Sequence, residues 1–300
     1  MAYEVAWREL VGSQPGPRLL VTGGVHGDEF EPMAAARRLL TEIPREALRG
    51  RLIVAPVVNE PAFRRGLRTA EDGLDLARTC PGRVDGSITE QVAHSLAELI
   101  RSADYYIDLH TGGTRLRVLP LAGYMLHPDA AILDTQRRMA RAFGLPLIWG
   151  SDWRLEGRSL SVARDAGVPA IYCEYQGGGD CDPRGIDAYV AGCRSVMAAL
   201  GMLEDSTLEP PVGLVVAEDD RPGAGHMQVN LPAPREGFFE PAVVLGERVR
   251  RGQTIGSVCD VLGDDRRLVT APHDGLIIVL HSFRRVEAGE SLGVILDAAT

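Results

Sequence analysis

A histidine and a glutamate stand three residues apart in a glycine-rich turn near the start of the chain. Residues 23–29 read GGVHGDE, with an apolar run before them and an amphipathic stretch after them. A neutral imidazole and a carboxylate this close together can hold one divalent cation, and Zn²⁺ accepts both kinds of donor. The glycines let the backbone bend until His26 and Glu29 converge. A surface turn uses the same residue types, so the metal interpretation depends on ligands elsewhere in the chain.

An apolar strand ends in two further ionisable residues. Residues 105–113 read YYIDLHTGG. Asp108 and His110 project to the same side of a strand because alternate side chains share a face. His110 is therefore a candidate third ligand, and Asp108 is a candidate for orienting a ligand or its loop. The alternative is a strand-end histidine that is hydrogen-bonded to a nearby turn.

A carboxylate lies at the end of a third apolar strand. Residues 168–179 read VPAIYCEYQGGG, which places Glu174 at the carboxyl end of a buried strand and shortly before glycines. Taken alone, Glu174 could cap a helix or pair with an arginine. In open α/β sheets, however, sites assemble at the carboxyl ends of the strands. The three segments therefore predict one shared site.

These motifs, in this order, resemble the succinylglutamate desuccinylase/aspartoacylase family, which comprises zinc amide hydrolases related to the zinc carboxypeptidases. Further matches lie between the ligand segments: residues 58–63 read VNEPAF, residues 75–82 read DLARTCPG and residues 83–90 read RVDGSITE. The resemblance covers nearly the whole chain. It is greatest to the branch that deacetylates N-acetyl-diaminobutyrate in ectoine breakdown.

The resemblance implies a mechanism and assigns residues to it. Zn²⁺, one ion per chain, is expected on three ligands: His26, Glu29 and His110. A fourth position on the metal stays open for water. Glu174 is expected to take a proton from that water and to pass it to the leaving amine. Arg68 is expected to stabilise the oxyanion, and Arg78 to bind a substrate carboxylate.

The implied enzyme is a zinc-dependent hydrolase of non-peptide amide bonds. It removes a short acyl group from an N-acyl amino acid or a similar small amine. Two alternatives stay open, a carboxypeptidase-like peptide hydrolase and a non-catalytic small-molecule binding protein that retains the fold.

Two positions depart from the family pattern. Ala77 stands where the family has an asparagine, and Cys80 stands where it has a phenylalanine before Pro-Gly. The missing amide removes part of the grip on the substrate carboxylate. We therefore expect a substrate different from those of the relatives.

Composition excludes several other classes of protein. The net charge of −9 and the pI of about 5.3 argue against a nucleic acid partner. No apolar run approaches the roughly 20 residues of a membrane span. All 32 basic residues are arginines, which excludes a P-loop lysine, a Schiff-base lysine and a biotinyl or lipoyl lysine.

The start of the chain and the cysteines point to a compartment. The first residues lack the basic and apolar regions of a secretory signal. The five cysteines are odd in number and have no Cys-x-x-Cys spacing, which is typical of reduced thiols. We therefore expect a cytoplasmic protein whose partner is a small-molecule N-acyl substrate, and a homo-oligomer stays open.

Apolar strands alternate with amphipathic helices over residues 18–201. The expected strands cover residues 18–23, 51–58, 104–110, 118–126, 146–149 and 169–175. The expected helices cover residues 31–43, 88–102, 129–143, 159–166 and 183–201. Several strands are continuous apolar runs, as in strands buried on both faces. This alternation predicts an α/β fold, in which helices cover both faces of a mixed central sheet, and the resemblance implies its zinc carboxypeptidase-like version.

The pattern changes near residue 205. Residues 204–211 are typical of a linker, and short strand-like pieces without a good helix follow. Residues 246–256 and 271–277 resemble the two halves of a lipoyl-like β-domain, although the hairpin tip at residues 262–267 has no lysine to modify. We expect a zinc-hydrolase catalytic domain over residues 1–205 and a β-rich domain over residues 206–300. The second domain is expected to cover the active-site mouth or to build an oligomer contact.

Overall fold

The strands expected from the sequence form a large mixed sheet whose parallel centre carries the candidate site. The computed structural model describes residues 3–227 and 230–297, and the other residues of the two expected domains, 1–2, 228–229 and 298–300, lie outside the described residues. The central parallel strands are, in spatial order, β3 (Arg49–Ala55), β2 (Gln14–Thr22), β4 (Tyr105–His110) and β7 (Ala170–Gly177). Their register sets Thr22 opposite Asp108, and His110 opposite Glu174. The ionisable residues of β4 and β7 are therefore neighbours at one edge of the sheet.

Further strands extend this sheet on both sides. β1 (Arg8–Val11) is antiparallel to β3, and β5 (Leu116–Met125) is antiparallel to β7. Beyond β5 lie β6 (Leu147–Ser151) and β8 (Val215–Glu218), each parallel to the strand before it. The sequence does not predict β1, because this four-residue strand buries a single side chain.

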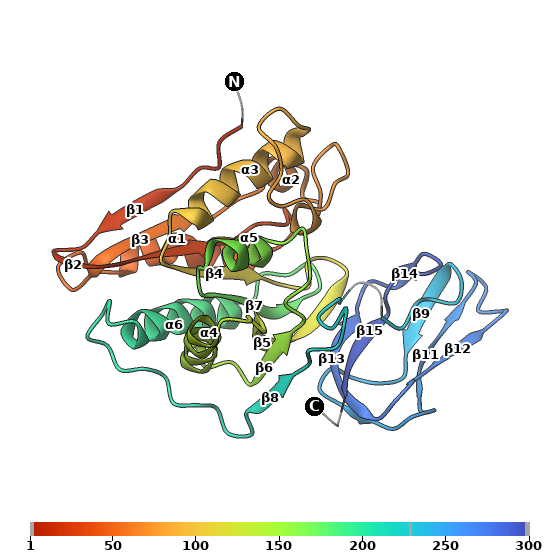
Figure 1. Cartoon of the computed structure of the whole chain (residues 1–300). Coiled ribbons are helices and arrows are strands. Elements are labelled where there is room, and N and C mark those ends of the chain that lie inside the picture. Colours follow the sequence, from red (N-terminus) through yellow and green to blue (C-terminus); the bar gives the residue numbers. More distant parts are fainter. Residues whose placement is uncertain (1–2, 228–229, 298–300) are drawn as a thin grey trace.

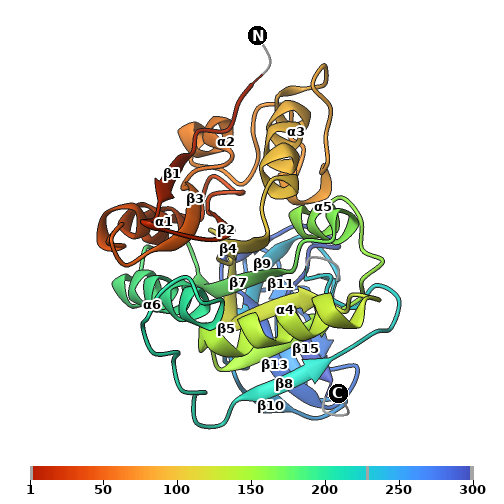
Figure 2. The same ribbon diagram turned by 60° about the vertical axis from the view of Figure 1, so that its left-hand side comes forward.

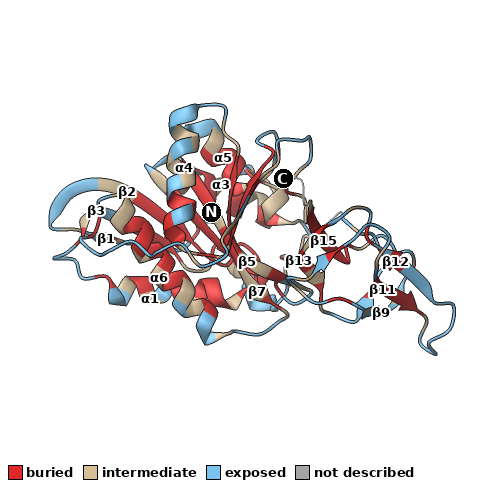
Figure 3. Ribbon diagram, turned by 90° about the horizontal axis from the view of Figure 1, so that it is seen from below, coloured by how far each residue is buried: buried red, intermediate tan, exposed pale blue. Residues whose placement is uncertain are grey.

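Helices cover both faces of the sheet (Figures 1 and 2). On one face, the apolar side chains of α1 (Phe30–Glu42), α4 (Ala130–Phe143) and α6 (Pro183–Ala199) share one core cluster with the strands. On the other face, α3 (Ile88–Arg101) and α5 (Ser159–Ala166) share a second cluster. Figure 3 shows the buried residues between these layers. The predicted mixed sheet with helices on both faces is confirmed.

The connection between β3 and α3 brings polar residues over the carboxyl ends of the strands. It contains α2 (Glu60–Arg65) and a short 3₁₀ helix, η1 (Leu76–Arg78). The Asn59 side chain caps α2 by accepting a hydrogen bond from the Ala62 N–H at 3.2 Å. At the start of α3, the Ser87 N–H donates to the Glu90 carboxylate at 2.8 Å, as a capping box requires.

The C-terminal residues contribute to two sheets. One is a four-stranded sheet with the spatial order β12 (Arg267–Thr270), β11 (Thr254–Cys259), β9 (Gly237–Pro241) and β14 (Arg285–Val286). The remaining strands join the large sheet: β13 (Gly275–His281) pairs with β5, β10 (Arg248–Val249) and β15 (Gly293–Asp297). The division at residues 205 and 206 and the lipoyl-like likeness stay predictions. The structure adds that β8 and β13 lie in the large sheet.

The cysteines and the helices bear on two expectations from the sequence, reduced thiols and the absence of a membrane span. All five cysteines are free thiols. Within residues 3–227 and 230–297, no helix is both long enough and apolar enough to cross a membrane.

Candidate metal centre and active site

The three expected metal ligands converge at the carboxyl edge of the central strands. His26 and Glu29 lie in the turn between β2 and α1, and His110 is the last residue of β4. One ligand atom from each lies within 4.8 Å of the other two, and all three residues are buried. The turn can pass this close to α2 because residue 27 is glycine. A Cβ there would come within 2.1 Å of the Ala62 backbone.

Both histidines present the same nitrogen to Glu29. The His26 Nδ1 is 2.6 Å from Glu29 Oε1, and the His110 Nδ1 is 3.2 Å from Glu29 Oε2. The other nitrogen of each ring faces a different carboxylate. His26 Nε2 is 3.1 Å from Asp75 Oδ1, and His110 Nε2 is 3.1 Å from Asp108 Oδ2.

This arrangement fits a divalent metal such as zinc. A neutral imidazole that donates its Nε2 proton to a carboxylate leaves a bare Nδ1, which is the form that binds metal. Two bare nitrogens that face a carboxylate need a positive charge between them. A metal ion held by one Glu and two His supplies that charge and has the donor set of catalytic zinc sites.

The pKa values of Glu29 and His110 also favour a positive charge at this position. Burial alone would raise the pKa of Glu29, but His26 and His110 outweigh it and hold the pKa well below its usual range. Burial would lower the pKa of His110, but Asp108 and Glu29 raise it well above its usual value. The site therefore keeps an ionised Glu29 carboxylate beside His110, whose positively charged form is favoured.

Two hydroxyl groups hold the Asp108 carboxylate in place. Thr22 Oγ1 donates to Asp108 Oδ1 at 2.7 Å, and Ser159 Oγ donates to Asp108 Oδ2 at 2.5 Å. Asp108 is fully buried. The expectation that Asp108 orients a ligand agrees with its contact with His110.

Glu174 lies beside the candidate metal ligands without being one of them. It is the register partner of His110 across β4 and β7, and it lines the same cavity as His26 and His110. Its Oε2 atom is buried and has no hydrogen bond to any described residue. Burial raises the pKa of Glu174 to about 8. The carboxylate form of Glu174 is therefore more basic than that of a glutamate in water.

Arg68 lies at the rim of the same centre. Its guanidinium donates to Asp75 Oδ2 at 3.0 Å and is 3.8 Å from Glu29 Oε1. Asp75 therefore contacts both Arg68 and His26, and it holds the predicted oxyanion donor next to a predicted ligand. The sequence motif contains Asp75, but nothing in the sequence predicts this second contact.

A second arginine accompanies Arg78 in the cavity. Arg78 and Ala77 both line it, and Arg158, which precedes α5, lines it as well. The Nε atom of Arg158 is buried without a hydrogen bond to a described residue. Burial and then the charge of Arg78 lower the pKa of Arg158 to about 10. Arg158 is not predictable as a site residue from the sequence, in which its one signal is its position directly before a helix.

The C-terminal half contributes to the walls of this site. Gly225 and Met227 line the cavity that contains Glu174. His226 Nδ1 lies 3.4 Å from an Arg158 guanidinium nitrogen. The segment after β8 therefore covers part of the site, which is one of the two roles expected for the C-terminal residues.

Comparison with known proteins identifies a matching family. Residues 15–200 match the succinylglutamate desuccinylase/aspartoacylase catalytic domain. The N-alpha-acetyl-L-2,4-diaminobutyric acid deacetylase of Halomonas elongata is 31% identical over 290 residues, which are 94% of this chain and 82% of that protein. A succinylglutamate desuccinylase of Burkholderia pseudomallei is 34% identical over 106 residues, which are 31% of this chain and 30% of that protein.

Solved structures share the whole fold. The product-bound ectoine utilization protein EutE (DoeB) of Ruegeria pomeroyi superposes with a TM-score of 0.87 at 27% identity, over 97% of this chain and 88% of that one. A succinylglutamate desuccinylase/aspartoacylase of Rhodobacter sphaeroides gives a TM-score of 0.85 at 27% identity, over 96% of this chain and 87% of that one. Because these likenesses span both sheets, the C-terminal strands belong to the shared fold.

Proposed function

This chain belongs to the succinylglutamate desuccinylase/aspartoacylase family, and we propose that it is a zinc-dependent deacylase. Its substrate is an N-acyl amino acid or a similar small amine, from which it removes the acyl group by hydrolysis. The observation that carries this proposal is the meeting of His26, Glu29 and His110 with Glu174, whose carboxylate has a buried oxygen without a hydrogen bond to any described residue.

Each residue of the site has its own role in the proposed hydrolysis. Zinc bound by its three candidate ligands would polarise the scissile carbonyl and acidify a water molecule. Glu174 accepts a proton from that water as the new carbon–oxygen bond forms, and it returns the proton to the nitrogen as the carbon–nitrogen bond breaks. Arg68 stabilises the negative charge that develops on the carbonyl oxygen. The products are a carboxylate and a free amine.

Two arginines favour a substrate that carries a carboxylate. Arg78 and Arg158 line the cavity that contains Glu174, which we call the inner cavity. Arg158 forms no ion pair with any described residue, and burying a guanidinium without a counter-charge is costly. A planar guanidinium matches a carboxylate with two parallel hydrogen bonds. The carboxylate of an amino acid product would supply the missing negative charge.

A small substrate fits the available space. The inner cavity has a volume of about 70 Å³, and Gly225 and Met227 cover it from the C-terminal side. This favours a single amino acid over a long peptide on the amine side of the scissile bond. We also propose that the enzyme is located in the cytoplasm.

A substrate screen tests the proposal. The purified zinc-loaded protein would be assayed against a panel of N-acetyl and N-succinyl amino acids, which includes N-acetyl-diaminobutyrate, N-succinylglutamate and N-acetylaspartate. The proposal predicts hydrolysis of at least one class at a kcat/KM of about 10⁴ M⁻¹s⁻¹ or more, as is ordinary for enzymes. Zinc binding without hydrolysis of any member would favour the alternative of a binding protein.

A further inference from the structure

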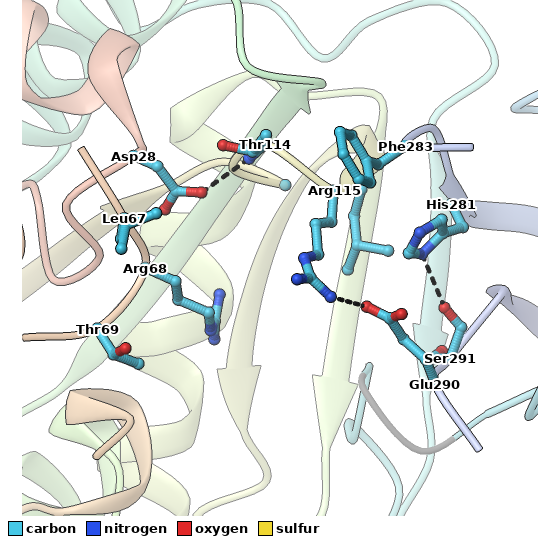
Figure 4. Close-up of a pocket in the computed structure, with 12 residues that line it drawn as sticks. Asp28, Leu67, Arg68, Thr69, Thr114, Arg115, His281, Phe283, Glu290 and Ser291 are labelled. Carbon is cyan, nitrogen blue, oxygen red and sulfur yellow. Dashed lines mark hydrogen bonds and ion pairs between the residues drawn. The ribbon is translucent and has the colours of Figure 1, made fainter. Parts of the chain in front are cut away.

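A second cavity lies beside the β2–α1 turn and the start of β5, and residues from the end of β13 onward form its other side (Figure 4). Its volume is about 610 Å³, and we call it the interdomain cavity. Asp28, Arg68 and Thr114 line it on the catalytic side, and His281, Phe283 and Glu290 line it on the C-terminal side. Figure 4 shows these residues on opposing walls.

The interdomain cavity adjoins the inner cavity through a single residue, Arg68, which lines both. Arg78 and Arg158 line only the inner cavity, and Asp28 lines only the interdomain cavity. On the proposed function, the scissile carbonyl lies beside Arg68 and the amino acid carboxylate lies at Arg78 and Arg158. The acyl group must then extend from Arg68 into the interdomain cavity.

Asp28 is a carboxylate of this cavity that forms no close ion pair with a described residue, and only the charge of Arg68 acts on it from a longer distance. It is 8% exposed. Its Oδ2 atom accepts one hydrogen bond, from the Thr114 N–H at 2.9 Å. Its Oδ1 atom is buried without any hydrogen bond to a described residue. A carboxylate oxygen that is this deeply buried ordinarily has a donor or a cation beside it.

The other charges that line the cavity are already matched. The Arg68 guanidinium is shared between Asp75 at 3.0 Å and Glu29 at 3.8 Å. The Arg115 guanidinium donates to Glu290 at 2.5 Å, across the boundary with the C-terminal strands. The charges of both arginines are therefore already partly neutralised, which weakens their attraction for an anionic acyl group.

The far wall adds a second acceptor. His281 donates from Nδ1 to the Ser291 carbonyl at 3.1 Å, so its neutral ring leaves Nε2 as an acceptor. That Nε2 atom is buried and has no hydrogen bond to a described residue. Burial lowers the pKa of His281, which favours the neutral ring. Each wall of the cavity thus contains one buried acceptor atom, Asp28 Oδ1 or His281 Nε2, without a hydrogen bond to a described residue.

We propose that the interdomain cavity is the acyl subsite of this enzyme and that it takes an acyl group ending in a protonated amine, which Asp28 binds. This inference rests on the proposed function, because it assumes hydrolysis at Arg68 and Glu174. The substrate class is then an amino acid that carries an aminoacyl group, with an ammonium group on the acyl side and a carboxylate on the amine side. With an α-amino acid as the acyl group this substrate is a dipeptide, so this inference extends the expected non-peptide amide bonds to a peptide bond.

The test varies only the end of the acyl group. The amine that performs best in the N-acetyl screen would be acylated with glycyl, 3-aminopropanoyl and 4-aminobutanoyl groups. Their methyl-terminated isosteres are propanoyl, butanoyl and pentanoyl, and a succinyl derivative supplies a negative end. The measured quantity is the ratio of kcat/KM for each ammonium compound to that of its isostere. A charged hydrogen bond makes this ratio about tenfold or more for at least one length in the wild type.

Two variants separate Asp28 from its surroundings. Asp28→Asn keeps an oxygen that can accept from Thr114 but removes the charge, so the ratio falls to about one. Glu290→Gln is the matched control, because Glu290 lines the same cavity but is already paired with Arg115, and there the wild-type preference for ammonium remains. Both substrates are measured on the same protein, so a loss of zinc or of folded enzyme lowers both rates and leaves the ratio intact.

The outcomes distinguish this subsite from the underlying activity. Hydrolysis without any preference for ammonium, a preference for succinyl, or a preference that survives Asp28→Asn would overturn the subsite and leave the deacylase standing. If no acyl derivative is hydrolysed, the proposed function fails and the subsite fails with it.

Discussion

At the scale of single residues, each candidate histidine ligand has a carboxylate beside its second ring nitrogen. Asp75 contacts His26, and Asp108 contacts His110, in each case through the Nε2 nitrogen. Such outer carboxylates fix the tautomer and the orientation of a ligating histidine. The site thus depends on residues that touch neither metal nor substrate.

Two substitutions should weaken zinc binding to different extents. His26→Ala removes a ligand and should abolish the zinc content of about one ion per chain. Asp108→Asn keeps all three ligands but loses the charge behind His110, which should lower the zinc affinity by about 10–100-fold. Elemental analysis and competition with a chelator measure both effects. Full zinc occupancy in His26→Ala would contradict the ligand assignment.

The absence of an amide beside Arg78 should also be measurable. Ala77 lines the inner cavity, so an asparagine there could reach a bound carboxylate. A hydrogen bond to a charged group contributes about 1.5–3 kcal/mol, so Ala77→Asn should raise kcat/KM for N-acetyl-diaminobutyrate, N-succinylglutamate or N-acetylaspartate by one to two orders of magnitude. If wild type already hydrolyses one of these efficiently and Ala77→Asn has no effect, the idea of a shifted substrate is wrong.

At the scale of elements, helix α6 ties together the strand ends that carry the site. The Tyr189 hydroxyl donates to the backbone carbonyl oxygen of His110, and it lies 3.3 Å from that of Cys173. Tyr189 is fully buried. One helix side chain therefore links the ends of β4 and β7, where His110 and Glu174 lie.

Loss of this hydroxyl should destabilise the fold. Tyr189→Phe leaves the His110 carbonyl without its donor, which should lower the free energy of unfolding by about 1–3 kcal/mol. Tyr175→Phe is the control, because Tyr175 is half-buried and its hydroxyl has no hydrogen bond among the described residues. That change should stay within about 0.5 kcal/mol. Equal stability of the two variants in urea unfolding would argue against the role of Tyr189.

The sequence predicts elements well where one local signal defines them. The continuous apolar runs predict β2, β4 and β7. The motif residues lie at or near the carboxyl ends of these strands: His110 ends β4, Glu174 lies in β7, and the turn with His26 and Glu29 follows β2. Arg158 and Asp75 could not be assigned in this way, since Arg158 reaches the site only by sharing a cavity with Arg78, and Asp75 contacts His26 from a different part of the chain. The pairing of β13 with β5 also has no local signal in the sequence, because it joins residues more than 150 positions apart.

At the scale of the whole molecule, we expect metal binding and folding to be linked. The candidate ligands come from the β2–α1 turn and from β4, so a bound ion connects separate parts of the sheet. An unfolded chain does not preserve this arrangement, and binding to the native state alone stabilises it.

Removal of the metal should therefore lower thermal stability. At a free zinc concentration about 1,000 times the Kd, the stabilisation is about 4 kcal/mol, which corresponds to a Tm shift on the order of 5–10 °C. Calorimetry of wild type with and without chelator measures this shift. His26→Ala is the control, because its Tm should not respond to the chelator. Identical Tm values for loaded and stripped wild type would contradict a resident metal at this site.

The central claim is that Glu174 moves the proton in a metal-dependent amide hydrolysis. The most direct measurement is the kcat of zinc-loaded Glu174→Gln on the best substrate of the screen, with zinc content and circular dichroism recorded on the same sample. If Glu174 is the base, the variant keeps the zinc content and the fold of the wild type, but its kcat is lower by about 10²–10⁴-fold, because an amide cannot accept the proton of water. A near-normal kcat in the zinc-loaded variant would contradict the account.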